Sequence, residues 1–210
     1  MSKNLKNRIY TSLGLFLLLI FMFKNNFILG YSLMVIGLLS IIEFHQININ
    51  IFKKWHVKSL ILDMLFIFYI FSIFSGFLIF STFSQIKIII FIILIICIFS
   101  DIGGYIFGKI LKGPKLTKIS PNKTITGAIG SLLFSSMSAL LIIFYITKNF
   151  EPLMIIVGSI TSIACQSGDL FFSFLKRKSN LKDTGNFLPG HGGILDRVDG
   201  MLLGIPVGFL

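Results

Sequence analysis

Two carboxylates near the end of the sequence have the spacing of a cation-binding pair. Asp196 and Asp199 lie three positions apart, so on a helix that begins near Gly193 both would lie on one face. Divalent cations bind through oxygen ligands of this kind. Asp169, at the end of the preceding apolar run, is either a third acid of the same site or an ion-pair partner for the basic residues that follow it.

The segment between Asp169 and Asp196 has the composition of an anion-binding loop. Basic side chains leave the apolar run together, and three glycines surround His191. Glycine lets backbone N–H groups approach an anion closely. A loop that only contacts lipid headgroups would explain the basic residues, but it would not explain the glycines or the aspartates among them. The segment therefore predicts a site for an anionic ligand and a cation.

A second polar segment surrounds Ser120 and Pro121. Serine followed by proline is typical of a helix start, with the serine as cap and the proline at the first helical position. Lys123 and Thr124 would then lie in the first turn, where free N–H groups favour phosphate. The alternative is an ordinary capped span whose lysines reach toward the membrane surface.

The elements that must position these residues are membrane helices. With 55% apolar and 13% charged residues, the chain cannot be a water-soluble globule, in which about a quarter of residues are charged. The apolar runs at 9–23, 60–80 and 86–99, for example, are about the length of a spanning helix, and barrel strands would be shorter and alternating. The last run, at 197–210, is short for a span. The sequence predicts an all-α polytopic membrane protein of about seven helices, at roughly 9–23, 27–44, 59–80, 86–108, 125–147, 152–175 and 197–210.

The distribution of charge predicts the topology. The intervals between the apolar runs hold 3, 1, 3, 1, 5, 1 and 5 Lys and Arg residues, starting at the N-terminus. The positive-inside rule then places the N-terminus in the cytoplasm. It also explains the net charge of +11, so nucleic acid is not needed as a partner. Seven of the eight acidic residues fall near the cytoplasmic side, which predicts a polar site that faces the cytoplasm.

Residues 173–199 resemble the signature of the phosphatidate cytidylyltransferase (CDP-diacylglycerol synthase) family. The pattern S-x-aliphatic-K-R, four residues, K-D-x-G, two residues, L-P-x-H-G-G-aliphatic-x-D-R-aliphatic-D agrees at every specified position. Residues 101–105 and 120–127 are similar to two further elements of the family, and residues 5–8 and 42–44 to its N-terminal part. Three positions depart from the usual pattern: Gly104 replaces Ala, and Ile125 and Thr126 replace Trp and Glu.

The resemblance implies a single membrane-embedded domain over 1–210, with its catalytic half at approximately 98–210. The implied reaction joins CTP and phosphatidate to give CDP-diacylglycerol and pyrophosphate. It implies Mg²⁺, leaves room for a second, monovalent cation such as K⁺, and leaves a homodimer open. The expected location is a membrane, the inner membrane in a bacterium, with membrane lipid around the helices.

The resemblance also assigns roles to residues. Asp169 and Asp196 are expected to bind metal, with Asp199 and Asp101 as additional candidates. His191 is expected to order the loop or touch phosphate rather than to act as a base. The other expected catalytic or substrate contacts are Lys176, Arg177, Lys182, Asp183, Gly192, Gly193, Arg197, Ser120, Lys123 and Thr124.

Three other functions stay open from the residues alone. A cation transporter would also place carboxylates in membrane helices, but polar residues should then reach both faces, and the outer halves of the spans are bare. A noncatalytic lipid-binding scaffold is another reading, and a related CTP transferase could act on a different lipid phosphate. Cys97 and Cys165 lie inside apolar runs with no metal-site spacing, so we expect them to be buried core residues.

Overall fold

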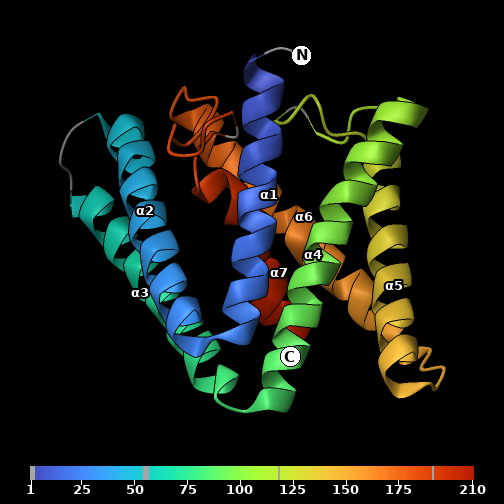
Figure 1. Cartoon of the computed structure of the whole chain (residues 1–210). Helices are drawn as coiled ribbons and strands as arrows, with labels where there is room; N and C mark the ends of the chain where they lie inside the picture. Colours follow the sequence, from blue (N-terminus) through green and yellow to red (C-terminus); the bar gives the residue numbers. More distant parts are fainter. Residues whose placement is uncertain (1–2, 54–56, 118, 191) are drawn as a thin grey trace. The chain divides into compact units, whose positions relative to one another are not determined.

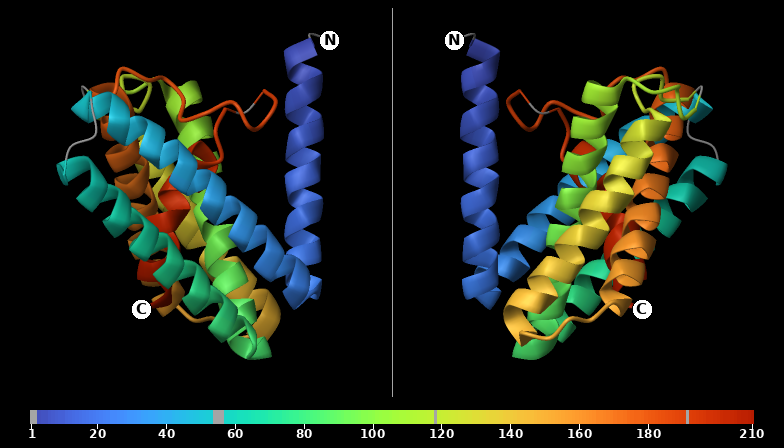
Figure 2. Two further views of the ribbon diagram at one scale, coloured as in Figure 1. Left: turned by 90° about the vertical axis from the view of Figure 1, so that its left-hand side faces the viewer. Right: turned by 90° about the vertical axis from the view of Figure 1, so that its right-hand side faces the viewer.

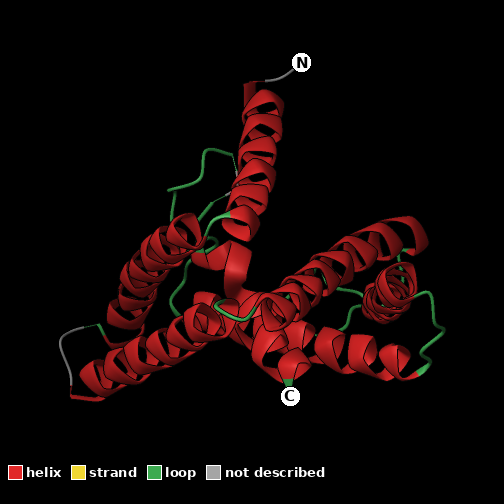
Figure 3. Cartoon of the chain, turned by 60° about the horizontal axis from the view of Figure 1, so that its bottom comes forward, coloured by secondary structure: helices red, strands yellow, loops and turns green. Residues whose placement is uncertain are grey.

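The computed structural model describes residues 3–53, 57–117, 119–190 and 192–210. Within these ranges the chain forms helices, loops and two isolated β-bridges but no β-strand (Figures 1 and 3). The predicted all-α architecture is confirmed, and each predicted apolar run overlaps one helix, although α1 begins before its predicted run and α2 extends well beyond 44. The helices are α1 (Lys3–Lys24), α2 (Asn26–Phe52), α3 (Val57–Ser81), α4 (Ser84–Leu111), α5 (Ile125–Thr147), α6 (Leu153–Lys178) and α7 (Leu195–Phe209).

Five of these helices, α2 to α6, are long and apolar enough to cross a membrane. Their outward surfaces carry large apolar side chains, such as Phe68 and Phe71 of α3 and Met137 of α5. Exposed apolar surface on this scale suits lipid rather than water. The chain is an integral membrane protein.

The chain divides into two compact units. The first contains Met1–Lys87 and Leu175–Val198, and the second contains Ile88–Phe174 and Asp199–Leu210. Helices α6 and α7 therefore each contribute residues to both units.

In the first unit, α2 and α3 run side by side as an antiparallel pair (Figures 1 and 2). The rings of Phe44 and Phe66 stack between them with centroids 4.0 Å apart. Helix α2 begins after Asn25, whose side chain accepts a hydrogen bond from the N–H of Phe27. This cap lets the chain turn sharply from α1 into α2.

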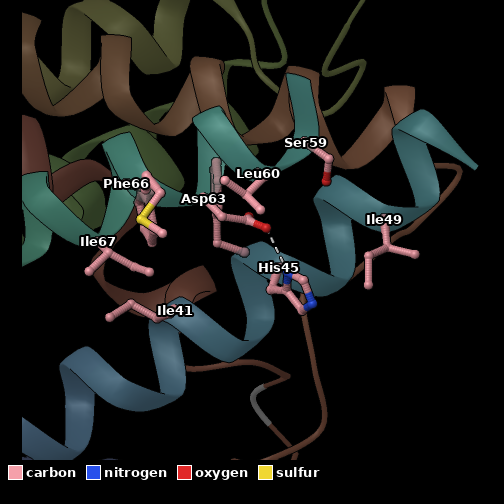
Figure 4. Close-up of a pocket in the computed structure, with 10 residues that line it drawn as sticks. Ile41, His45, Ile49, Ser59, Leu60, Asp63, Phe66 and Ile67 are labelled. Atoms are coloured by element: carbon pink, nitrogen blue, oxygen red, sulfur yellow. Dashed lines mark hydrogen bonds and ion pairs between the residues drawn. The ribbon is translucent and has the colours of Figure 1, made fainter. Parts of the chain in front are cut away.

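A polar cluster fixes α2 against α3 (Figure 4). His45 Nδ1 lies 2.7 Å from Asp63 Oδ2, and the Asn48 amide donates to Asp63 Oδ1 at 2.8 Å and to the Ser59 carbonyl at 2.7 Å. Polar contacts between membrane helices stabilise one register and rotation. The cluster therefore contributes to holding α2 and α3 together.

In the second unit, α7 packs through a stripe of glycines at every fourth position, Gly200, Gly204 and Gly208. A Cβ atom at Gly204 would lie 2.7 Å from Cys97 Sγ, and one at Gly200 would lie 2.8 Å from Cys165 Sγ. Small residues at this spacing let membrane helices approach closely. Both cysteines are free and buried, which confirms their predicted place in the core.

Candidate functional site

The loop between α6 and α7 is described at residues 179–190 and 192–194, and it folds back on itself. Leu181 N–H donates to the Lys176 carbonyl, which ends α6, and Leu188 N–H donates to the Gly192 carbonyl at 3.0 Å. Gly190 and Gly192 have φ angles of 79° and 83°, a region that other residues adopt only with strain. Two of the three predicted loop glycines are thus needed for the turn itself.

Asp196 lies at the centre of this loop. Its Oδ1 accepts a hydrogen bond from Lys176 Nζ at 2.6 Å, and its Oδ2 accepts from the N–H groups of Thr184 at 2.8 Å and Gly193 at 3.1 Å. Burial would raise the pKa of Asp196, but the bonds from Lys176 and from the two N–H groups outweigh burial and hold the pKa below its usual value. The carboxylate is therefore an anion at neutral pH.

The structure brings together the predicted residues Lys176, Asp196 and Gly193. The Gly193 N–H, however, is directed at Asp196 in this structure, so it orders the loop here. The side chains of Arg177, Lys182, Asp183 and Arg197 are exposed around this core. His191 lies outside the described residues.

Glu43 of α2 is a site residue that sequence reasoning missed. It is 0% exposed, and its carboxylate accepts hydrogen bonds from Thr184 Oγ1 at 2.6 Å, Ile194 N–H at 2.9 Å and Leu195 N–H at 2.8 Å. These N–H groups lie at the start of α7, where the helix dipole favours a negative charge. The signal that could have found Glu43 is its place in an apolar run, where an acid needs a dedicated partner.

The packing around Glu43 explains two glycines of the loop. A Cβ atom at Gly185 would lie 2.5 Å from Glu43 Oε1, and one at Gly193 would lie 2.5 Å from Glu43 Oε2. No larger residue fits at either position without moving the carboxylate. The loop is therefore built around Glu43 as well as around Asp196.

The N-terminal part of α1 also contacts this loop. Arg8 Nε donates to the Gly190 carbonyl at 3.0 Å, and Figure 2 shows the loop reaching toward α1. The first helix thus helps to position the glycine turn.

In the second unit, Lys123 Nζ donates to Asp169 Oδ2. The predicted helix start at Ser120–Pro121 is wrong, because α5 begins at Ile125 and its cap is Thr124, whose Oγ1 accepts from Gly127 N–H at 3.0 Å. Lys123 lies before the helix instead of in its first turn, since its carbonyl accepts from Leu116 N–H. The side chain of Lys123 reaches Asp169 from this loop segment, which folds back before α5.

Thr126, which departs from the family pattern, has a local structural role. Its Oγ1 accepts a hydrogen bond from Gly113 N–H at 3.2 Å. The hydroxyl thus ties the start of α5 to the loop that follows α4. The absence of a carboxylate here does not leave the loop unanchored.

The other two predicted acids have different surroundings. Asp101 of α4 is exposed, and its Oδ1 lies 3.9 Å from Cys165 Sγ. Asp199 of α7 is buried, and its Oδ1 accepts from Gly200 N–H at 2.9 Å. Among the described residues, no three His, Cys, Asp or Glu side chains gather as a ready metal site.

The chemistry of the donors nevertheless fits a hard divalent cation. Asp169 and Asp196 are carboxylates, and each is paired with a lysine. Oδ2 of Asp196 accepts from Thr184 and Gly193, and its Oδ1 accepts from Lys176. Oxygen ligands of this type are those that Mg²⁺ selects.

Comparison with known proteins places the chain among cytidylyltransferases. It is 44% identical over 110 residues to the phosphatidate cytidylyltransferase of Staphylococcus haemolyticus, covering 51% of this chain and 42% of that one. It is 41% identical over 123 residues to that of Rickettsia felis, covering 54% of each. The chain spans about half the length of the curated relatives it matches. Residues 2–210 match the sequence model of the Cytidylyltransferase family, and the chain belongs to that family.

Proposed function

We propose that this protein transfers the cytidylyl group of CTP to phosphatidate, giving CDP-diacylglycerol and pyrophosphate in phospholipid biosynthesis. The relatives in Staphylococcus and Rickettsia carry the name of this activity. The observation that carries the proposal is the network of Glu43, Thr184, Lys176 and Asp196, which orders a cation-rich loop at the end of a membrane helix. A loop of this kind can bind phosphate groups of a nucleotide and of a lipid together.

In the proposed reaction, a phosphate oxygen of phosphatidate attacks the α-phosphorus of CTP. A new P–O bond forms, the bond between the α-phosphorus and its bridging oxygen breaks, and pyrophosphate leaves with that electron pair. The second pKa of a phosphomonoester is about 6, so the nucleophile is largely a dianion at neutral pH. Positioning and charge neutralisation therefore supply most of the catalysis, and no strong base is required.

The residues have separate roles in this proposal. Lys176, already aligned by Asp196, would neutralise charge on the reacting phosphates. The exposed Arg177, Lys182 and Arg197 can reach the outer phosphate oxygens, and Lys123 can contact nucleotide or phosphatidate. Ser120, Thr124, Asp183 and Gly192 remain proposed substrate contacts, as does His191.

Asp169 and Asp196 are the proposed ligands for Mg²⁺, with Asp101 and Asp199 as additional candidates. Bound there, the cation would neutralise negative charge on the triphosphate. Lys176 favours the ionised form of Asp196, because a positive charge beside an acid stabilises its charged form. The proposal also includes binding of a second, monovalent cation such as K⁺.

The proposed site faces the cytoplasm, where CTP is available. The alternation of Lys and Arg along the sequence supports this orientation, and the bacterial origin of the relatives supports the inner membrane as the location.

One assay tests the function. Purified protein in detergent is supplied with CTP, phosphatidate and Mg²⁺, and pyrophosphate release is followed together with the lipid product. We expect both products in equal amounts, and we expect EDTA to stop the reaction until Mg²⁺ is restored. Diacylglycerol without its phosphate and UTP in place of CTP are the matched controls. Absence of the nucleotide-linked lipid, or equal use of a different lipid phosphate, would contradict the proposal.

A further inference from the structure

A large apolar cavity lies in the first unit, beside the loop between α6 and α7. Its volume is about 590 Å³, and it is lined by α1, α2, the loop and the start of α7. This volume falls within the range of about 300–1,000 Å³ that is typical of small-molecule sites. Leu15 and Leu18 of α1 and Ile28 and Val35 of α2 form part of its wall.

The loop contributes aliphatic side chains to this wall. Leu188 and Ile194 both line the cavity, although the same loop also carries glycines and the charged residues Lys182 and Asp183. Phosphate binding gives no role to an aliphatic residue. Their positions are set by main-chain bonds: Leu188 N–H donates to Gly192, and Ile194 N–H donates to Glu43. The same loop thus contributes polar groups to the proposed phosphate site and apolar side chains to this cavity.

The cavity also has a charged residue and an opening. Arg197 is the charged residue among the described side chains that line it. Tyr31 and Phe27 of α2 line it as well, and they are 73% and 90% exposed. Because α2 is long and apolar enough to span the membrane, these exposed side chains face lipid. A molecule can therefore enter sideways from the bilayer with an alkyl chain inside and an anionic group near Arg197.

We propose that this cavity binds an acyl chain of the phosphatidate substrate and holds its phosphate near Arg197. The proposal rests on the proposed function and names the lipid subsite of that same site. Bulk phospholipids carry a phosphodiester with one negative charge, whereas the phosphomonoester of phosphatidate carries nearly two at neutral pH. The cationic end of the cavity therefore favours phosphatidate over the surrounding lipid.

The first test is direct and does not depend on turnover. Phosphatidate with a diazirine near the end of one acyl chain is photolysed with the whole protein in detergent micelles, and labelled peptides are mapped by mass spectrometry. Phosphatidylcholine with the same labelled chain is the control. We expect phosphatidate to label peptides of α1 and α2 around Leu15 and Val35 several times more strongly than phosphatidylcholine does.

The second test fills the cavity. Val35→Trp should raise the KM for long-chain phosphatidate about tenfold, equivalent to the loss of about two buried CH₂ groups. The KM for CTP and the KM for dihexanoyl phosphatidate should stay unchanged, because the short chain does not reach the filled space. Met137→Trp, on the exposed face of α5, is the matched control and should change none of these values.

The outcomes separate the two proposals. Equal labelling by phosphatidylcholine, or no labelling of α1 and α2, would overturn the lipid subsite even if the enzyme is active and even if Val35→Trp fails to fold. Selective labelling without any formation of CDP-diacylglycerol would instead contradict the proposed function and leave the lipid-phosphate site standing.

Discussion

The hydroxyl of Thr184 lies 2.6 Å from the carboxylate of Glu43 and 3.0 Å from that of Asp196. A hydroxyl has one proton, so it donates to only one carboxylate at a time. The shorter contact is to Glu43, while the Thr184 N–H donates to Asp196 at 2.8 Å. One residue therefore links a carboxylate of α2 to the proposed metal-binding carboxylate of α7.

This linkage predicts that Glu43→Gln reduces activity without removing substrate affinity. The amide keeps the size of the side chain, but its NH₂ group must face one of the donors that now meet the carboxylate. An unsatisfied buried donor costs about 1–3 kcal/mol, so we expect kcat to fall about tenfold or more and the unfolding temperature to drop. Steady-state kinetics and thermal unfolding in detergent measure both.

Glu151→Gln is the control for this variant, because Glu151 is exposed beyond the end of α5. It should behave as the unmodified protein does. Unchanged kcat in Glu43→Gln would show that Glu43 does not position the loop for catalysis.

The two lysine-paired aspartates should be indispensable. Asp169→Asn and Asp196→Asn each remove a proposed Mg²⁺ ligand while keeping the shape of the side chain, so turnover should fall below a tenth of its normal value. The proteins should still extract and elute as folded species in size-exclusion chromatography. More than a tenth of normal turnover in either variant would remove that residue from the proposed metal site.

The polar cluster between α2 and α3 should contribute to stability rather than chemistry. In Asp63→Asn the contacts to His45 and Asn48 weaken, and interhelical bonds of this type contribute about 0.6–1.7 kcal/mol. We expect a lower unfolding temperature with kcat reduced less than threefold. A large loss of kcat at unchanged stability would instead place Asp63 in the reaction.

Cysteine labelling should confirm the topology. A membrane-impermeant thiol reagent applied from outside should label cysteines introduced at Lys24, Ser84 and Lys148, but not those at Lys53, Lys115 and Lys178. Ser84 replaces the predicted outer position Lys87 because Lys87 is buried and bonded to Asn26. The native cysteines are buried, so background labelling should be low. Labelling at Lys115 from outside would reverse the proposed orientation.

Several features could be predicted from the sequence because they depend on local pattern. The apolar runs predict the seven helices, since only a helix satisfies its own backbone groups in lipid. The glycines of the loop between α6 and α7 predict that the chain turns there, and Gly190 and Gly192 have φ angles of 79° and 83°. Both conclusions need only neighbouring residues or a short loop.

Other features depend on contacts between distant segments. Glu43 meets the start of α7 from 152 positions away, and no local pattern reveals which buried donors an acid in α2 will find. The apolar run at 125–147 predicted the bounds of α5, but its cap at Thr124 was missed. Ser120–Pro121 has the better local capping signal, whereas the hydrogen bond from Leu116 to Lys123 keeps the chain out of a helix there. Local residue types determined the helices and the glycine-containing loop between α6 and α7, while tertiary packing decided which carboxylates hold that loop, because a buried charge is stable only where the fold supplies its partners.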